Sequence, residues 1–230
     1  MINSKPATPG SGKNRWTNFF IVQAWLVLLL ASFFGAALAG IQLTLAPKIE
    51  ANKLNETLEK VPELILGADA ARTFKDSGRL MEVNRQYVTA GAKTYSVFKA
   101  EKDNQTAGWV VKASGQGYAD KIELLVGVDE TVDTITGLFV LDQKETPGLG
   151  NKIMEPDWRK QFVSKSTHLQ LTAVKTEADG PGEISAITGA TISSKAVCDI
   201  VNQSLNNLRQ PLAKAASDKE KTSEKQQEKN

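Results

Sequence analysis

Four hydroxyl side chains lie within 188–194, the last seven residues of the segment 184–194, which reads ISAITGATISS. Apolar residues recur at helical spacing after it, so 188–194 is expected to begin a helix. The first amides of a helix have no partner within it and carry the positive end of its dipole, so they favour an anion such as a phosphate. Small residues let a ligand approach the backbone. The residues of this candidate phosphate site are Thr188, Gly189, Ala190, Thr191, Ser193 and Ser194.

The residue types alone leave a simpler interpretation open. Ser and Thr are common at the first position of helices, where their hydroxyls bond to free amides. Thr191 or Ser193 could therefore cap an ordinary helix that binds no ligand. The pattern by itself does not decide between a cap and a phosphate site.

The segment TGAT at 188–191 resembles the [Ser/Thr]-Gly-Ala-Thr signature of the FMN-binding domain family. In that family the last Thr carries FMN through a phosphoester bond, so the resemblance implies covalent FMN on Thr191. It also implies a separate flavin transferase that installs the bond. The family commonly has an acidic residue six positions before the acceptor, where this chain has Ser185.

A second block, ETPGLGNK at 145–152, resembles the flavin-contacting loop of the same family. Pro147 followed by Gly148 favours a type II turn, because proline fixes the first central residue and glycine accepts the positive φ of the second. The turn would present Leu149 to the flavin ring. A further block, 115–118, resembles a Gly-x-Gly-Tyr block of the family, but its glycines are expected only to bend the chain. The loop residues that the resemblance implies at the flavin are Glu145, Thr146, Pro147, Gly148, Leu149, Gly150 and Lys152.

The composition excludes several classes of protein. The net charge is +2 over 230 residues, and no basic cluster with interleaved aromatic residues suggests a nucleic acid partner. The single Cys198 cannot form an intrachain disulfide or a cysteine-rich metal site, and the single His168 cannot form a metal centre. Without a dinucleotide fingerprint or a nucleophile–base–acid set, we expect no catalytic residue and an electron carrier rather than a complete catalyst.

The N-terminal part contains an uncharged stretch of membrane-spanning length. We expect a cytoplasmic tail at 1–15 and a transmembrane anchor at 16–47, where about 20 apolar residues suffice to cross a bilayer. The alternative is a signal peptide cleaved before Gly40. Lysine and arginine counts on the two sides are equal, so they do not orient the chain. The family resemblance implies a single-pass protein of the inner (cell) membrane with its C-terminal domain in the periplasm or otherwise outside the cytoplasm.

The rest of the chain favours an α+β fold, an antiparallel sheet with flanking helices preceded by one transmembrane helix. We expect an amphipathic helix and lead-in at 48–94, with that helix stopping before Pro62, an FMN-binding domain at 95–210 and a charged disordered tail at 211–230. Alternating patterns and short turns predict antiparallel neighbours. The expected elements are strands at 95–100, 109–113, 122–128, 134–141 and 169–174, a helix at 155–163, and a last helix that ends near Leu208.

Among anchored members of the family, the arrangement most resembles the G subunits of Rnf-type ion-translocating ferredoxin:NAD oxidoreductases. The resemblance implies electron transfer through the flavin while the complex moves Na⁺ or H⁺, with the membrane and the other membrane subunits as partners. The alternatives are the C-type subunit of a sodium-translocating NADH:quinone oxidoreductase, a stand-alone extracytoplasmic flavin reductase, and a module that binds a phosphate-bearing ligand noncovalently.

Overall fold

The structure is a computed structural model that describes residues 14–78, 81–103 and 105–227. The chain divides into two compact units, Met1–Asn52 and Lys53–Asn230. Most of the tail expected at 1–15 lies outside the described residues, and its last two residues already belong to a helix.

The first unit is the N-terminal part of helix α1 (Asn14–Leu66). Its large apolar side chains from Trp25 to Leu43 are exposed. Within α1, the stretch Gln23–Leu66 contains a segment long and apolar enough to cross a membrane. The observed helix therefore fits the anchor expected at 16–47.

Helix α1 does not stop at Pro62, as the sequence predicted, but continues to Leu66. Proline in a helix interior removes a hydrogen bond and costs about 3 kcal/mol. The buried side chains of Val61, Leu64 and Ile65 surround the proline in sequence and pack into the second unit. Their burial offsets the cost, at about 1.5–3 kcal/mol for each large apolar side chain.

The second unit is built on a five-stranded antiparallel sheet whose strands follow one another in the order β1-β2-β3-β4-β5. The four strands predicted between residues 95 and 141 are confirmed; the first three extend beyond their predicted bounds, and the fourth is shifted by one residue. The first strand and the short helix before it lie in 68–90, where the sequence pattern predicted no element. The bounds are α2 Ala68–Asp76, β1 Glu82–Ala90, β2 Lys93–Lys102, β3 Gln105–Gln116, β4 Lys121–Val128 and β5 Ile135–Asp142.

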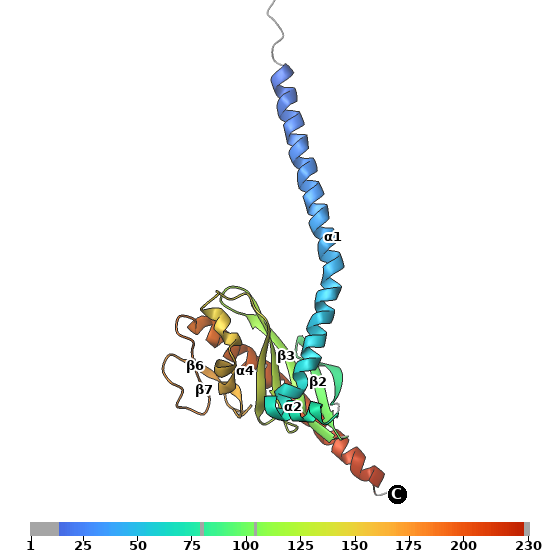
Figure 1. Cartoon of the computed structure of the whole chain (residues 1–230), viewed down its shortest axis with the longest axis vertical. Coiled ribbons are helices and arrows are strands. Elements are labelled where there is room, and N and C mark those ends of the chain that lie inside the picture. Colours follow the sequence, from blue (N-terminus) through green and yellow to red (C-terminus); the bar gives the residue numbers. More distant parts are fainter. Residues whose placement is uncertain (1–13, 79–80, 104, 228–230) are drawn as a thin grey trace, which may run out of the picture. The chain divides into compact units, whose positions relative to one another are not determined.

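Each face of the sheet is covered by a helix (Figure 1). Helix α4 (Thr191–Gln227) packs on the face that carries Tyr95, Val97 and Trp109. The C-terminal turns of α1, from Lys53 onward, pack on the other face. Neighbouring residues of one strand thus belong to different cores, as expected from the two-residue period of a strand.

Between β5 and α4 the chain forms short elements that surround the start of α4. The helix expected at 155–163 is present as two shorter pieces, and its Trp158 and Phe162 pack edge to face with ring centroids 5.2 Å apart. Only the end of the strand expected at 169–174 is regular, and it pairs in parallel with a second short strand. The bounds are η1 Gly150–Met154, α3 Pro156–Arg159, η2 Lys160–Phe162, β6 Thr172–Val174 and β7 Glu183–Ser185.

Helix α4 continues past Leu208, so its predicted end there was wrong. Leu208 and Leu212 are one turn apart on either side of Pro211, and both are buried in the core. Their packing holds the helix through the proline. The disordered tail expected at 211–230 is helical over 211–227, and its last three residues lie outside the described part.

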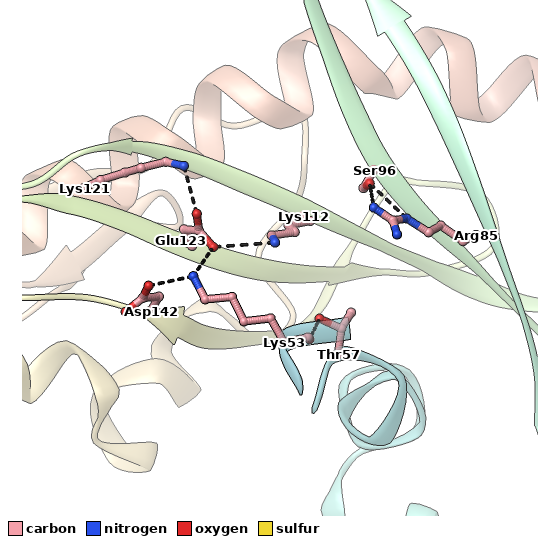
Figure 2. A network of polar contacts seen from close by, with 8 residues as sticks. All are labelled: Lys53, Thr57, Arg85, Ser96, Lys112, Lys121, Glu123 and Asp142. Atoms are coloured by element: carbon pink, nitrogen blue, oxygen red, sulfur yellow. Dashed lines mark hydrogen bonds and ion pairs between the residues drawn. The ribbon is translucent and has the colours of Figure 1, made fainter. Parts of the chain in front are cut away.

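An ion-pair network joins α1 to the sheet (Figure 2). Glu123 on β4 and Asp142 at the end of β5 are register partners, and two carboxylates in this position repel each other. Lys53 lies between them, with its Nζ 3.2 Å from Glu123 Oε2 and 2.7 Å from Asp142 Oδ2. Lys112 and Lys121 also contact Glu123, at 3.5 and 2.8 Å. The lysines offset the repulsion.

Electrostatics change the protonation of this network. Burial by itself raises the pKa of Glu123, but the hydrogen bonds from Lys121 and Lys53 and the charge of Lys112 outweigh it and lower the pKa from 4.5 to about 2. The hydrogen bond to Asp142 raises the pKa of Lys53 above 10.5. Near neutral pH both groups are charged, and each favours the folded state.

We predict that Glu123→Gln weakens the dependence of folding stability on pH in the acid range. The folded pKa of Glu123 is below its ordinary value, so its contribution is present above about pH 4.5 and is lost as the pH falls towards 2. Thermal unfolding of the full chain in detergent, followed from pH 7 to pH 2, measures this. The variant should be less stable at pH 7 and lose less on acidification. Glu130→Gln, at an exposed turn carboxyl, is the control, and equal acid slopes in all three proteins would contradict the prediction.

Candidate functional site

Helix α4 begins at Thr191, immediately after a tight turn. The Ala190 amide donates to the Ile187 carbonyl at 2.8 Å and closes the turn, in which Gly189 has a φ of 80°. The Ser194 hydroxyl donates to the Ala190 carbonyl and accepts from the Ile187 amide, both at 3.0 Å. Ser194 therefore ties the turn to the first turn of the helix.

Ser193 does not cap the helix, because its hydroxyl is committed to a carboxylate. It donates to Glu145 Oε2 at 2.5 Å, and Glu145 Oε1 accepts from the Ala119 amide at 3.1 Å. Glu145 is only 4% exposed. The bonds join three segments that are far apart in sequence: the β3–β4 turn, the loop after β5 and the start of α4.

Two glycines lie so close to the Glu145 carboxylate that a side chain at either position would clash with it. A Cβ atom on Gly117 would lie within 2.4 Å of Glu145 Oε1, and one on Gly150 would lie 2.9 Å from Glu145 Oε2 and 2.7 Å from Ser193 Oγ. Neither residue is among the described glycines with positive φ. The 115–118 block thus does more than bend the chain, because Gly117 permits close approach of a buried side chain.

The loop 146–149 has the predicted turn. Its Leu149 amide donates to the Thr146 carbonyl at 3.2 Å, and Gly148 has a φ of 76°, as a type II turn requires. A Cβ atom on Gly189 would lie 3.0 Å from Leu149 Cδ2. The two motif turns are therefore packed against each other through Leu149, which is still 43% exposed.

The structure brings the two motif blocks together, but their residues differ in solvent exposure. Ala190, Ser193, Ser194, Glu145 and Gly150 are buried. Thr191 is half-buried. The exposed members are Thr188, Gly189, Thr146, Pro147, Gly148, Leu149 and Lys152.

Ser185 lies at the position where the family commonly has an acidic residue. Its amide, carbonyl and hydroxyl groups all form hydrogen bonds. Its amide donates to Gln161 Oε1 at 2.8 Å, and its carbonyl accepts from Trp158 Nε1 at 2.9 Å. Its hydroxyl accepts from the Ala178 amide at 2.9 Å. The serine is part of a packed support for β7.

Sequence reasoning did not find the Ser193–Glu145–Ala119 connection or the role of Gly117. The only signal was the Gly-x-Gly block at 115–117, whose second glycine makes room for Glu145.

The remaining reactive residue types lie apart from the motifs. Cys198 is buried, and burial raises the pKa of its thiol to about 12. His168 is exposed and contacts Asp133 at 2.9 Å. In the described part of the chain, no group of three or more His, Cys, Asp or Glu side chains is arranged to hold a metal ion.

Comparison with known proteins matches the same region of the chain. Residues 117–206 match the family described as the FMN-binding domain. The chain is 40% identical over 111 residues to the G subunit of the Na(+)-translocating ferredoxin:NAD(+) oxidoreductase complex of Acetobacterium woodii, and the match covers 47% of this chain and 53% of that protein. The chain spans about half the length of this and other curated relatives that it matches.

A longer match extends over most of the chain. The G subunit of the ion-translocating oxidoreductase complex of Pasteurella multocida is 33% identical over 203 residues, which is 82% of this chain and 93% of that protein. The crystal structure of NqrC from Shewanella oneidensis has the same fold, with a TM-score of 0.57 and 18% identity over 73% of this chain and 99% of that one. The chain therefore belongs to the FMN-binding family that includes the G subunits of ion-translocating oxidoreductase complexes.

Proposed function

We propose that this chain carries FMN on Thr191 through a phosphoester bond. The observation that carries the proposal is the state of the four hydroxyls at the start of α4. Those of Ser193 and Ser194 are used to bond Glu145, Ala190 and Ile187. Among the described residues, the hydroxyls of Thr188 and Thr191 have no hydrogen-bond partner, and only Thr191 belongs to the helix.

The start of α4 fits a phosphate. The first intrahelical bond there runs from the Ser194 amide to the Ala190 carbonyl, so helix geometry leaves the amides of Thr191, Ile192 and Ser193 without an intrahelical acceptor. These amides and the helix dipole can offset the charge of a phosphoester on Thr191 Oγ. The glycine turn before them keeps the backbone accessible.

The chain is poorly equipped to form this bond by itself. A threonine hydroxyl is a weak nucleophile without an adjacent base. Glu145 is the carboxylate that the structure places at the start of α4, and its oxygens are bonded to Ser193 and Ala119. We therefore assign the attachment to a separate flavin transferase.

With FMN bound, the redox chemistry belongs to the cofactor, and the protein holds and orients it. The proposed role is that of an electron-carrying subunit in an Rnf-type ion-translocating ferredoxin:NAD oxidoreductase complex. The relatives that support this role are named as the G subunit of a Na(+)-translocating ferredoxin:NAD(+) oxidoreductase complex and as the G subunit of an ion-translocating oxidoreductase complex. The other membrane subunits of the complex would be its partners.

The apolar segment of α1 would anchor the chain in the inner (cell) membrane as a single span. We propose that the FMN-binding domain lies in the periplasm or otherwise outside the cytoplasm. A covalent bond would prevent loss of the flavin there.

We predict that Thr191→Ala abolishes flavin that survives denaturation. The full chain, co-produced with a flavin transferase, should gain the mass of one FMN less one water and show a fluorescent band after denaturing electrophoresis. Thr191→Ala should show neither, because no oxygen remains for the ester. Thr188→Ala is the matched control, since it removes the other free hydroxyl and should keep the flavin at least partly.

Peptide mass mapping can give results that contradict attachment at Thr191. Extra mass on Thr188, Ser193 or Ser194 would move the attachment site. Flavin that co-purifies but is released by denaturation would favour the noncovalent binding module instead.

We predict that Glu145→Ala lowers both stability and the fraction of labelled chain. It leaves the Ser193 hydroxyl and the Ala119 amide without their acceptor in a buried site, at about 1–3 kcal/mol for each unsatisfied group. Glu145→Gln keeps the size and one acceptor and should lie between the wild type and the alanine variant. Denaturant unfolding and intact mass measure the two effects. Glu155→Ala, which removes an exposed carboxylate outside both motif blocks, should change neither. A stable, fully labelled Glu145→Ala would exclude the supporting role.

We predict that reporters fused after Asn230 place the domain outside the cytoplasm. The point after Leu208 is unsuitable, because α4 continues and Leu212 is buried. Alkaline phosphatase, which folds only outside the cytoplasm, should be active at Asn230 and inactive when fused before Met1. A cytoplasm-only reporter that is active at Asn230 would reverse the assignment.

A further inference from the structure

The two edges of the five-stranded sheet differ in what covers them. The edge at β5 is covered, because the Ile135 amide donates to the Lys165 carbonyl at 2.9 Å and the Ser164 amide donates to the Ile135 carbonyl at 2.8 Å. Arg159 Nη1 also donates to the Leu138 carbonyl at 2.8 Å. The edge at β1 has no such cover. In the described part of the chain, no residue of β1 forms a backbone–backbone hydrogen bond outside its ladder with β2.

The hairpin between β1 and β2 shows which backbone groups point away from β2. Ala90 pairs with Lys93 across a two-residue turn, and the pairing continues without a shift to the start of β1. The pair that closes such a hairpin is hydrogen-bonded, and hydrogen-bonded and non-hydrogen-bonded pairs alternate from there. Thr89 and Thr94 thus form a non-hydrogen-bonded pair, whose side chains approach closely, and their hydroxyls are 3.1 Å apart. The outward-facing amides and carbonyls belong to Val83, Arg85, Tyr87 and Thr89.

Strand β1 lacks the features that usually protect an exposed edge. Such edges are very short, or carry proline, lysine or a bulge. β1 is nine residues long, its sequence EVNRQYVTA contains neither proline nor lysine, and its register with β2 has no bulge. The Arg85 side chain is directed towards β2, where Arg85 Nη2 donates to Ser96 Oγ at 3.0 Å (Figure 2). The edge can therefore accept a further strand.

The sequence of β1 is complementary to itself in the antiparallel direction. When two copies pair around Gln86, all nine residues have a partner, and the outward-facing residues meet as Arg85 opposite Tyr87 and Val83 opposite Thr89. A guanidinium group over an aromatic ring is attractive, and Arg85 Cζ already lies 4.8 Å from the ring centroid of Tyr87 in its own strand. Each arginine would then contact a tyrosine of both copies.

Other registers are less favourable. A shift by two residues in one direction places Arg85 opposite Arg85 of the second copy, and like charges directly opposite each other are destabilising. The same shift in the other direction leaves Glu82 and Val83 without partners. A shift by one residue opposes outward-facing backbone groups to inward-facing ones, which cannot form the ladder.

We infer that β1 binds β1 of a second copy of this chain, so that the two sheets join into one continuous antiparallel sheet. In a contact of this symmetry the same edge serves both copies. The inference goes beyond the proposed function and does not depend on flavin at Thr191. It would bring two FMN-binding domains together.

A cysteine at the centre of the register tests the pairing. Gln86 is exposed and would lie opposite itself, at a Cα distance of about 4.5 Å that a disulfide can span. Glu82→Cys is the matched control, because this exposed residue would be roughly 26 Å from its copy. The native Cys198 is buried and its thiol has a pKa of about 12, so it should not react. Membranes that contain each full-length variant are oxidised with copper phenanthroline, and non-reducing electrophoresis measures the dimer.

Gln86→Cys should give several-fold more dimer than Glu82→Cys. Adding Tyr87→Lys, at a position that is 66% exposed, places a lysine opposite Arg85 and should lower the dimer several-fold. Adding Arg85→Glu as well should restore it, because the opposed charges then differ in sign. Thermal unfolding of each variant shows that the domain is still folded.

Equal crosslinking of Gln86→Cys and Glu82→Cys would overturn the inference, as would the absence of dimer from Gln86→Cys. A crosslink from Gln86→Cys to a different protein would assign the edge to another partner and would also overturn it. Dimer that is insensitive to Tyr87→Lys would contradict the register on which the inference depends.

Discussion

The carboxylate of Glu145 is buried between the β3–β4 turn, the loop after β5 and the first turn of α4. It accepts from Ser193 and from the Ala119 amide, and Gly117 and Gly150 leave room for it. A buried charge without partners would be costly, so the three segments must stay together to keep it satisfied. This one group therefore links the turn before α4 to the β3–β4 turn and to the loop after β5.

Sequence patterns predicted four of the five strands of the sheet. They failed for the strand whose buried and exposed residues do not alternate, and for two helices that continue through a proline because of tertiary packing. The strands β2 to β5 have at least one buried face, whereas β1 is an edge strand without a buried residue. The sequence of β1 shows no regular alternation of apolar and polar residues that would have predicted a strand. Pro62 and Pro211 were taken as helix ends, but large buried side chains on both sides of each proline continue the helix.

The candidate site was predicted by motif rather than by geometry. The two blocks around Pro147 and Thr191 were recognised from their amino-acid sequences, which resemble motifs of the family. The structure places the two blocks in contact through Leu149. The bond between Glu145 and Ser193 joins residues 48 positions apart and has no local signature. Hydroxyl content alone also could not separate Thr191 from its neighbours, because the difference lies in which hydroxyls the fold already uses.

The support around Ser185 has a consequence for the flavin transferase proposed above. Its amide and carbonyl are bound to Gln161 and Trp158, whereas Thr188 and Gly189 at the tip of the turn are exposed. An enzyme acting on the folded chain can reach the tip but not the backbone of residue 185. An enzyme that grips the whole segment as an extended peptide must first break those bonds. Folding and modification would then compete for the same backbone groups, and the maturation yield would depend on which is faster.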